Sequence, residues 1–492
     1  MRHRVNKFFF IGLILSAAIS LGLGIEFSGG NTIEYWLYMN SALDSLSFKD
    51  HFEDRLKLNL NYEKLRIGTV FFYWHLSAPN QNRLLYFDYN CDYTDQIFEL
   101  TYGRYYVTFG KGLCLNQYLD EDFRVDNSIF GLKGVLKYEG SELTFLAGEP
   151  RNIFFEENIY KIKNDTLDRL RGINLDSRLR LLNTVNMNLG ARYVRYHRPV
   201  DITPRAFTEL FGGNIEVNLG PYEGYLEYAQ HLGSYPYIGG RLTGNALFFS
   251  SALTIPGLGI NFQLMNYDSI GFGGAGYRYN EVPTPIKSGT SINRGIDEFG
   301  YGLGLVCSLL DKLNIDLQHN TINSHNKNEV ILEQIGNFKY LFFDNLEGRL
   351  NFEHNQKNNI ELPIKKKTEF KPTCEFSYTL ENYFIDFSYE HNFISADSSK
   401  YYEHAVVFSL GRAERAQFTL RLERRNRTPI WLIPKIGDER YWILAELSWD
   451  ISDRHNLRVR VGSEKGGIIC SGGVCRYEEP FRGIKLVLTS IF

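Results

Sequence analysis

Charged side chains are the main chemical groups of this sequence, and they fall into two sets. The first set lies in a loop-like segment, Gly110–Asn127, and consists of Asp120, Glu121, Asp122, Arg124 and Asp126. The second set occupies the polar positions of segments in which polar and apolar residues alternate, and it includes Arg178, Arg180, Glu347, Arg349, Arg421, Glu423, Arg458 and Arg460. Such groups can guide small polar solutes, or they can pair with one another across neighbouring strands.

No arrangement of side chains in the sequence points to catalysis. There is no GxSxG, HExxH or CxxC motif, and no Ser/His/Asp or paired-carboxylate pattern stands out. The GFGGAG segment (271–276) lacks the strand-to-helix context of a phosphate-binding loop. We therefore expect no enzyme, no cofactor and no metal ion, while a lipid enzyme at one rim stays open as an alternative.

The cysteines give one narrow prediction. Six cysteines are too few for a disulfide framework in a chain of 492 residues. Cys470 and Cys475, in the segment CSGGVC, are spaced to close a small loop. A disulfide between them is the preferred interpretation. Two free thiols and a metal site stay open, although no histidine or carboxylate shares the segment.

Five histidines recur near the ends of predicted strands that run in the same direction: His75, His197, His319, His354 and His391. Such strands alternate in a sheet, so neighbouring histidines would lie about 10 Å apart, twice the strand spacing. That separation is too large for two of them to share a metal ion. We expect them, with Arg195 and nearby tyrosines, to anchor the protein at a membrane interface, where they could contact lipid phosphates.

The elements that carry these residues are predicted from a two-residue period that runs from Ile25 to Phe492. In DRLKLNLNYE, for example, Leu56, Leu58 and Leu60 share one face, while the intervening residues are polar. A helix would smear these two sets around its surface. The abundance of aromatic residues, 32 Tyr and 36 Phe, is typical of strands that cross a membrane between aromatic girdles.

Connections of two kinds alternate along the chain. Tight turns fall near 62–64, 139–142, 182–184, 220–223, 256–259, 310–312, 344–345, 381–383, 412–415 and 452–454. Longer loops lie at 40–52, 110–127, 150–166, 270–297, 428–439 and 466–474. Short turns on one side and long loops on the other are typical of outer-membrane barrels. The tally predicts an all-β fold: a single large antiparallel up-and-down transmembrane β-barrel of about 24 strands, without a plug domain.

The first residues predict export. Arg2, Arg4 and Lys7 precede a short apolar run, and Ala18-Ile19-Ser20 fits a signal-peptidase site. We assign 1–20 to a signal peptide and 21–492 to the barrel; an uncleaved anchor helix is the alternative. Cleavage would leave 51 Lys and Arg against 57 Asp and Glu, a mild acidity that argues against nucleic acid as a partner.

The last strand carries a specific resemblance. FRGIKLVLTSIF places Ile484, Leu486, Leu488 and Phe492 on one face. A final amphipathic strand that ends in Phe resembles the terminal strand read by the barrel-assembly machinery. This resemblance implies Phe492 as the assembly signal, the assembly machinery and outer-membrane lipid as partners, and the bacterial outer membrane as the location.

A second resemblance covers about thirty residues, Arg104–Val135. The segment RYYVTFGKGLCLNQYLDEDFRVDNSIFGLKGV is similar to part of an uncharacterised family of large outer-membrane barrels of Bacteroidota and related phyla. In that family a strand ends in a Gly-x-Gly turn, and a polar loop then leads to an Asp-Asn pair. The family has no assigned activity, so the resemblance implies architecture alone.

A barrel of about 24 strands encloses a wide lumen, since 16–18 strands already leave an aqueous channel. This lumen is either open, filled by inward-folded loops or occupied by a partner protein or lipoprotein. In general porins the third loop folds inward with acidic residues facing a basic wall, and by analogy Gly110–Asn127 is our candidate constriction; a solvated outer loop is the alternative. The leading hypothesis is a pore for small polar solutes, and the second is an assembly scaffold around a lumenal partner.

Overall fold

The computed structural model describes residues 24–492 apart from 39–49, 77–81, 122–123, 157–158, 165–168, 182–183, 198–206, 235–240, 272–278, 288–291, 293–294, 310–311, 360–365, 398, 414, 427–439, 472–473 and 479. The assigned signal peptide lies outside these residues. None of the helices in the described part is long and apolar enough to cross a membrane.

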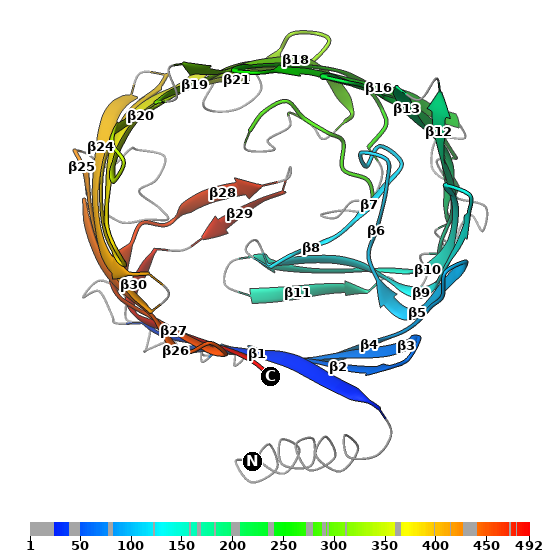
Figure 1. The fold of residues 1–492 in the computed structure, drawn as a ribbon, viewed down its shortest axis with the longest axis horizontal. Coiled ribbons are helices and arrows are strands. Elements are labelled where there is room, and N and C mark those ends of the chain that lie inside the picture. The colour runs from blue at the N-terminus through cyan, green and yellow to red at the C-terminus, as the bar shows by residue number, and fades with distance from the viewer. Residues whose placement is uncertain are drawn as a thin grey trace.

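Twenty-four strands form the wall of one closed antiparallel barrel, which confirms the predicted fold (Figure 1). Each strand pairs with its neighbours in chain order. The wall strands are β1 (Glu26–Tyr38), β2 (Asp50–Tyr62), β3 (Leu65–Leu76), β4 (Asn82–Thr94), β5 (Phe98–Tyr105), β9 (Val125–Tyr138), β10 (Ser141–Glu156), β12 (Arg169–Leu181), β13 (Val185–His197), β14 (Phe207–Leu219), β15 (Tyr222–Ser234), β16 (Arg241–Ile255), β17 (Leu258–Asp268), β18 (Asp297–Leu309), β19 (Leu313–Asn323), β20 (Glu329–Phe343), β21 (Leu346–Asn359), β22 (Lys366–Leu380), β23 (Tyr383–Ala396), β24 (Ser399–Arg412), β25 (Ala416–Arg425), β26 (Tyr441–Ser452), β27 (His455–Glu464) and β30 (Phe481–Ile491).

Six shorter strands do not belong to the wall. Four form hairpins or extensions within loops: β6 (Val107–Phe109), β7 (Leu115–Gln117), β8 (Leu119–Asp120) and β11 (Ile159–Asn164). The last two, β28 (Gly467–Ser471) and β29 (Val474–Glu478), form a hairpin between β27 and β30. No separate plug domain is present among the described residues, because β1 begins the wall directly.

The barrel closes where its two ends meet. β1 pairs with β30 from Gly30↔Ile491 to Tyr38↔Gly483. The backbone of Gly29 donates a hydrogen bond to the Phe492 carbonyl oxygen at 2.7 Å, and the Phe492 amide donates one back at 3.0 Å. On the outer face, the Phe492 ring stacks on Phe27 with a centroid distance of 6.1 Å. The final residue therefore completes the seam at the short-turn end.

Apolar side chains face outward because each strand alternates its side chains between two faces. In β12, Ile173, Leu175 and Leu179 are between 40% and 44% exposed on the outer face. Arg178 and Arg180 lie on the opposite, lumenal face of the same strand. The exposure of so many large apolar side chains around the wall is the pattern expected of a surface that faces lipid.

The connections divide between the ends of the barrel as predicted, with two differences. The residues at 95–97 form an additional short turn, closed by a hydrogen bond from the Asp95 amide to the Phe98 carbonyl oxygen at 2.8 Å. At the long-loop end, β23 ends at Ala396 and β24 begins at Ser399, so this connection is short. Glu139 and Gly140 both have positive φ angles, 43° and 84°, as a two-residue hairpin turn requires.

Three predicted loops contain strands. Residues 150–156 of the expected loop 150–166 continue β10, which then turns back to pair with β11. The expected loop 110–127 contains β7 and β8, and its last residues begin β9. Within 466–474, the β28–β29 hairpin places Cys470 opposite Cys475 in the backbone register. Opposed residues of an antiparallel pair are close enough for a disulfide. The disulfide itself stays a prediction, because the two side chains lie outside the described set.

The seam gives a prediction that separates closure from assembly. Phe492→Ala and Phe27→Ala each remove one side of the ring stack, so each should lower the stability of the refolded barrel by about 0.5–1.5 kcal/mol, measured as the shift of the urea midpoint. If Phe492 is also the assembly signal, only Phe492→Ala should strongly lower the amount of folded barrel in cells. If both variants lowered the amount of folded barrel in cells equally, the assignment of Phe492 as the assembly signal would be contradicted.

Candidate functional site: a lumen narrowed by docked loops

Several segments from the long-loop end lie inside the ring of wall strands (Figure 1). They are the third connection, which carries β6, β7 and β8; the β10–β11 hairpin; the connection between β17 and β18; and the β28–β29 hairpin. β29 contacts β10, so hairpins from two separate parts of the wall meet within the lumen. The candidate functional site is the interior that these segments shape.

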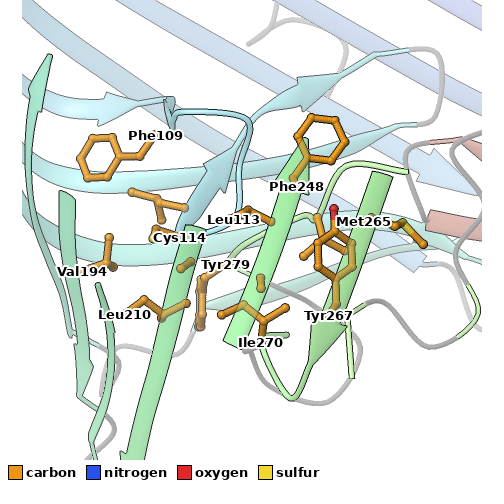
Figure 2. Packing of buried hydrophobic residues seen from close by; sticks show 14 of the residues in the cluster. Phe109, Leu113, Cys114, Val194, Leu210, Phe248, Met265, Tyr267, Ile270 and Tyr279 are labelled. Atoms are coloured by element: carbon orange, nitrogen blue, oxygen red, sulfur yellow. The ribbon is translucent and has the colours of Figure 1, made fainter. Parts of the chain in front are cut away.

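The third connection folds into the lumen and packs on wall strands that follow it closely in the chain (Figure 1). Leu113, Cys114 and Leu115 at the tip of its β6–β7 hairpin are fully buried. They pack against inner-face residues of β13–β16, such as Leu210 (Figure 2). Gly212 gives Cys114 its space, because a Cβ at this position would lie 2.6 Å from the Cys114 Sγ. Burial raises the pKa of the Cys114 thiol to about 12, so this cysteine is neutral and acts as a small apolar group.

The described residues of the β17–β18 connection form a second inward segment, which packs against the third connection. Tyr279 is fully buried, and its ring lies 4.5 Å from the ring of Tyr196 on β13. The Asn116 amide donates to the Tyr279 carbonyl oxygen at 2.8 Å. The Asn280 side chain donates to the Leu113 carbonyl oxygen at 2.8 Å. The two segments therefore share one apolar core inside the barrel, as Figure 2 shows.

A buried ion pair fixes the tip of the third connection. Arg192 on β13 and Glu227 on β15 have fully buried side chains and lie 2.7 Å apart. Glu227 also accepts hydrogen bonds from the Lys111 backbone amide at 2.8 Å and from the Tyr225 hydroxyl at 2.7 Å. Gly110 has φ of 60°, and a Cβ there would overlap the Arg192 guanidinium. The Gly-Lys-Gly turn is thus shaped to sit on this pair, and we call Arg192, Glu227 and the 110–112 turn the latch.

The predicted charges of the third connection lie against the wall, where they pair with charges of both signs. Glu121 accepts a hydrogen bond from Lys57 and lies 3.3 Å from Arg55, both on β2. Burial by itself would raise the pKa of Glu121. The hydrogen bond from Lys57 and the positive charges of Lys57 and Arg55 outweigh burial and hold this pKa below its usual value. Arg124 instead contacts acids, at 2.8 Å from Glu34 and 3.3 Å from Glu53.

The expected pattern of loop acids facing wall bases therefore holds for Glu121, whereas Arg124 is a loop base that faces wall acids. Asp126 lies 3.1 Å from Arg104, which in turn contacts Asp88 on β4 at 3.0 Å. Asp120 forms part of the lining of a small cavity between the loop and the wall. Asp122 lies outside the described residues. The third connection is thus held at both ends of its path, by this charge cluster near β1–β5 and by the latch near β13–β15.

The wall from β20 to β27 keeps exposed charged side chains on its lumenal face toward the short-turn end, whereas inward residues nearer the long loops, such as Ile335, Tyr401 and Trp442, are buried. Six of the eight predicted lining residues lie on β21, β25 and β27, and the other two, Arg178 and Arg180, lie on β12; all eight are on faces opposite the outward apolar residues of their strands. Glu347 contacts Lys339 at 2.6 Å and Arg349 at 2.5 Å. Arg421 pairs with Glu423, and Arg460 pairs with Glu446. The side chains of Arg349 and Arg458 are 50% and 47% exposed. Cross-strand pairing and exposure to water therefore coexist on this wall.

The β28–β29 hairpin begins at another charged anchor. Lys465, just before β28, contacts Glu403 on β24 at 2.8 Å and Glu423 on β25 at 3.4 Å. Arg425 also contacts Glu403, at 2.6 Å. This network places the base of the hairpin against the inner wall.

Sequence reasoning missed the latch and one histidine contact. Arg192 and Glu227 lie in strands with an ordinary alternating pattern. The one sequence signal that could have identified them is that each is a charged residue next to apolar inward residues, such as Val194 and Ala229. The histidine prediction compared strands of one direction and overlooked His404 on β24. His404 lies opposite His391 in the register, and their Nδ1 atoms are 3.1 Å apart. Among the described residues, no group of three or more His, Cys, Asp or Glu side chains is placed to hold a metal ion.

Solved barrels share the outline of this fold at low similarity. The siderophore receptor PirA from Pseudomonas aeruginosa is 11% identical, with 95% of this chain and 80% of that chain covered and a TM-score of 0.49. The P pilus usher PapC translocation pore is 9% identical, with 95% and 99% covered and a TM-score of 0.48. Pseudomonas aeruginosa OccK11 (OpdR) is 12% identical, with 75% and 96% covered and a TM-score of 0.39. At these scores the strand pairings, and not the likenesses, define the architecture.

The sequence comparisons are narrower. No curated protein matches the sequence. Residues 11–284, which include the first seventeen strands and the third connection, match a family described as a family of unknown function, DUF6029. The match spans more than half of the chain, and the protein therefore belongs to this family.

Proposed function

We propose that this protein is a bacterial outer-membrane channel for small polar solutes, in which inward-folded loops occupy part of the lumen and narrow the passage. The observation that carries the proposal is the unequal lining of the interior. One part of the wall is covered by an apolar core of inward loops. The wall from β20 to β27 keeps exposed, paired charges on its lumenal face.

The outer surface supports placement in a membrane. Its apolar side chains form a band around the barrel, and aromatic residues such as Phe27, Tyr383 and Phe492 lie near its short-turn edge. A surface of this kind is stable only against hydrocarbon. The closed wall also leaves no strand edge unpaired, as a membrane-spanning sheet requires.

The lumenal charges support small polar solutes as cargo. Lys339, Glu347 and Arg349 alternate in sign within a few ångströms. The fields of such opposite charges largely cancel at distances greater than their separation, so the passage should discriminate weakly between anions and cations. The scaffold hypothesis gains less support, because the loops of this chain themselves cover the inner wall from β13 to β16 that a lumenal partner would use.

The first test is conduction. The purified full-length barrel, inserted in a planar bilayer in potassium chloride, should give discrete conductance steps. Its reversal potential across a salt gradient should lie near zero, since the proposed lining carries both signs. A folded, heat-modifiable preparation that inserts and gives no steps would overturn the proposed function.

The second test concerns the latch. Glu227→Ala removes the acceptor of the Lys111 amide and strands the buried Arg192 charge, a change that costs about 3–5 kcal/mol. The tip of the third connection should then leave the wall, and the single-channel current should become larger or noisier. Asp95→Asn is the matched control, because it breaks an exposed ion pair with Lys64 at the short-turn end. A Glu227→Ala current identical to that of the control would show that the latch does not shape the passage.

A further inference from the structure

A row of polar and aromatic side chains crosses the outer face of the barrel from β19 to β26. Its upper line is set by the register, His319↔Gln334↔His354. Its lower line continues through His391↔His404↔Arg424↔Tyr441. We call His319, Gln334, His354, His391, His404 and Arg424 the histidine row.

Hydrogen bonds and ring contacts join neighbouring members of the row. The Gln334 amide contacts His319 Nδ1 at 3.2 Å and His354 Nδ1 at 3.1 Å. The Tyr389 hydroxyl lies 2.8 Å from His404 Nδ1. The Arg424 guanidinium lies 5.5 Å from the centre of the Tyr441 ring, which is 62% exposed.

The row lies near the long-loop edge of the outward apolar residues. On its short-turn side, the outward positions are apolar, for instance Phe352 and Leu350 on β21 and Phe408 and Leu410 on β24. On its long-loop side, the outward positions are mixed: Gln356 of β21 is polar, whereas Phe393 of β23 and Tyr402 of β24 are exposed aromatic residues. From Tyr383 to His391 the strand climbs eight residues, or about 20 Å along the barrel axis at the usual tilt. This height is close to the apolar band of about 25 Å in membrane barrels.

The charge along this boundary is mainly positive. Arg424 in the row and Lys366 and Lys400 just above it are exposed on the outward face. The acid at the same rim, Asp397, is engaged, because its carboxylate accepts the Lys366 backbone amide at 2.9 Å. Imidazole, guanidinium and phenol groups at the edge of an apolar band can all donate hydrogen bonds to a phosphate.

We propose that the histidine row binds the phosphate groups of an anionic lipid in the leaflet next to the long-loop end. The ligand needs an acyl chain and a phosphate in one molecule. The acyl chain covers the apolar residues below the histidine row, and the phosphate accepts hydrogen bonds from the donors in the row. This inference rests on the membrane placement in the proposed function but not on conduction.

The test measures lipid selectivity directly. The full-length barrel is reconstituted in phosphatidylcholine vesicles with a small fraction of spin-labelled phosphatidic acid or spin-labelled phosphatidylcholine, and the motionally restricted lipid is quantified. The wild type should favour phosphatidic acid by about five-fold, the factor that one basic group near an anionic surface supplies. The triple variant H391Q/H404Q/R424Q should fall close to equal preference, and R424K alone should keep most of the selectivity.

Arg421→Gln is the matched control, because Arg421 lies three residues from Arg424 on the same strand and faces the lumen. It should keep the wild-type lipid selectivity. Unchanged selectivity in the triple variant, or an equal loss in the control, would overturn the proposal. Displacement of the labelled lipid by inorganic phosphate would also overturn it, since the site would then recognise a free ion. Gel mobility with and without heating verifies that each variant is folded. The lipid selectivity can also be measured on a barrel that does not conduct, so this test is independent of the conduction test.

Discussion

Every backbone amide and carbonyl group in the wall needs a hydrogen-bond partner, and the rest of this structure depends on that requirement. A sheet that faces hydrocarbon has no water to satisfy an open edge, so the wall has to close on itself. Closure falls to the last strand, where Gly29 and Phe492 exchange two backbone hydrogen bonds. The alternation of apolar and polar side chains follows, because one face meets hydrocarbon and the other meets the lumen.

Closing 24 strands creates a second requirement, because the interior is too wide for wall side chains to fill. Here the chain fills part of it with its own long-end connections. Their backbone groups find partners in one another, in the wall side chain of Glu227 and in loop side chains such as Asn280. The buried Arg192–Glu227 pair is costly to desolvate, but it gives the third connection one specific resting place. On the outer surface, the polar and basic side chains of the histidine row lie toward the long-loop end, above outward apolar residues such as Phe352 and Phe408.

The wall was largely predictable from the sequence, whereas the interior was not. A two-residue period reports which residues share a face, so Leu56 and Leu58 could be assigned outward and Arg178 and Arg180 inward from the sequence alone. Turn chemistry at Glu139 and Gly140 likewise marks a hairpin. The period does not report which wall strands an inward loop packs against. The contact of Lys111 with Glu227 joins residues 116 positions apart, and no local pattern encodes it. The same limit explains why His404 was overlooked, because its pairing with His391 depends on the register of the β23–β24 hairpin.

The central claim is that loops of this chain are fixed inside the barrel and leave a polar passage along one part of the wall. An experimental density map of the full-length protein in lipid nanodiscs tests it most directly. The account predicts density for 106–121 and 269–296 inside the lumen, with Lys111 on Glu227 and ordered water beside Arg349 and Arg421. Density for these two segments outside the barrel, or a lumen filled along its whole β20–β27 side, would contradict it.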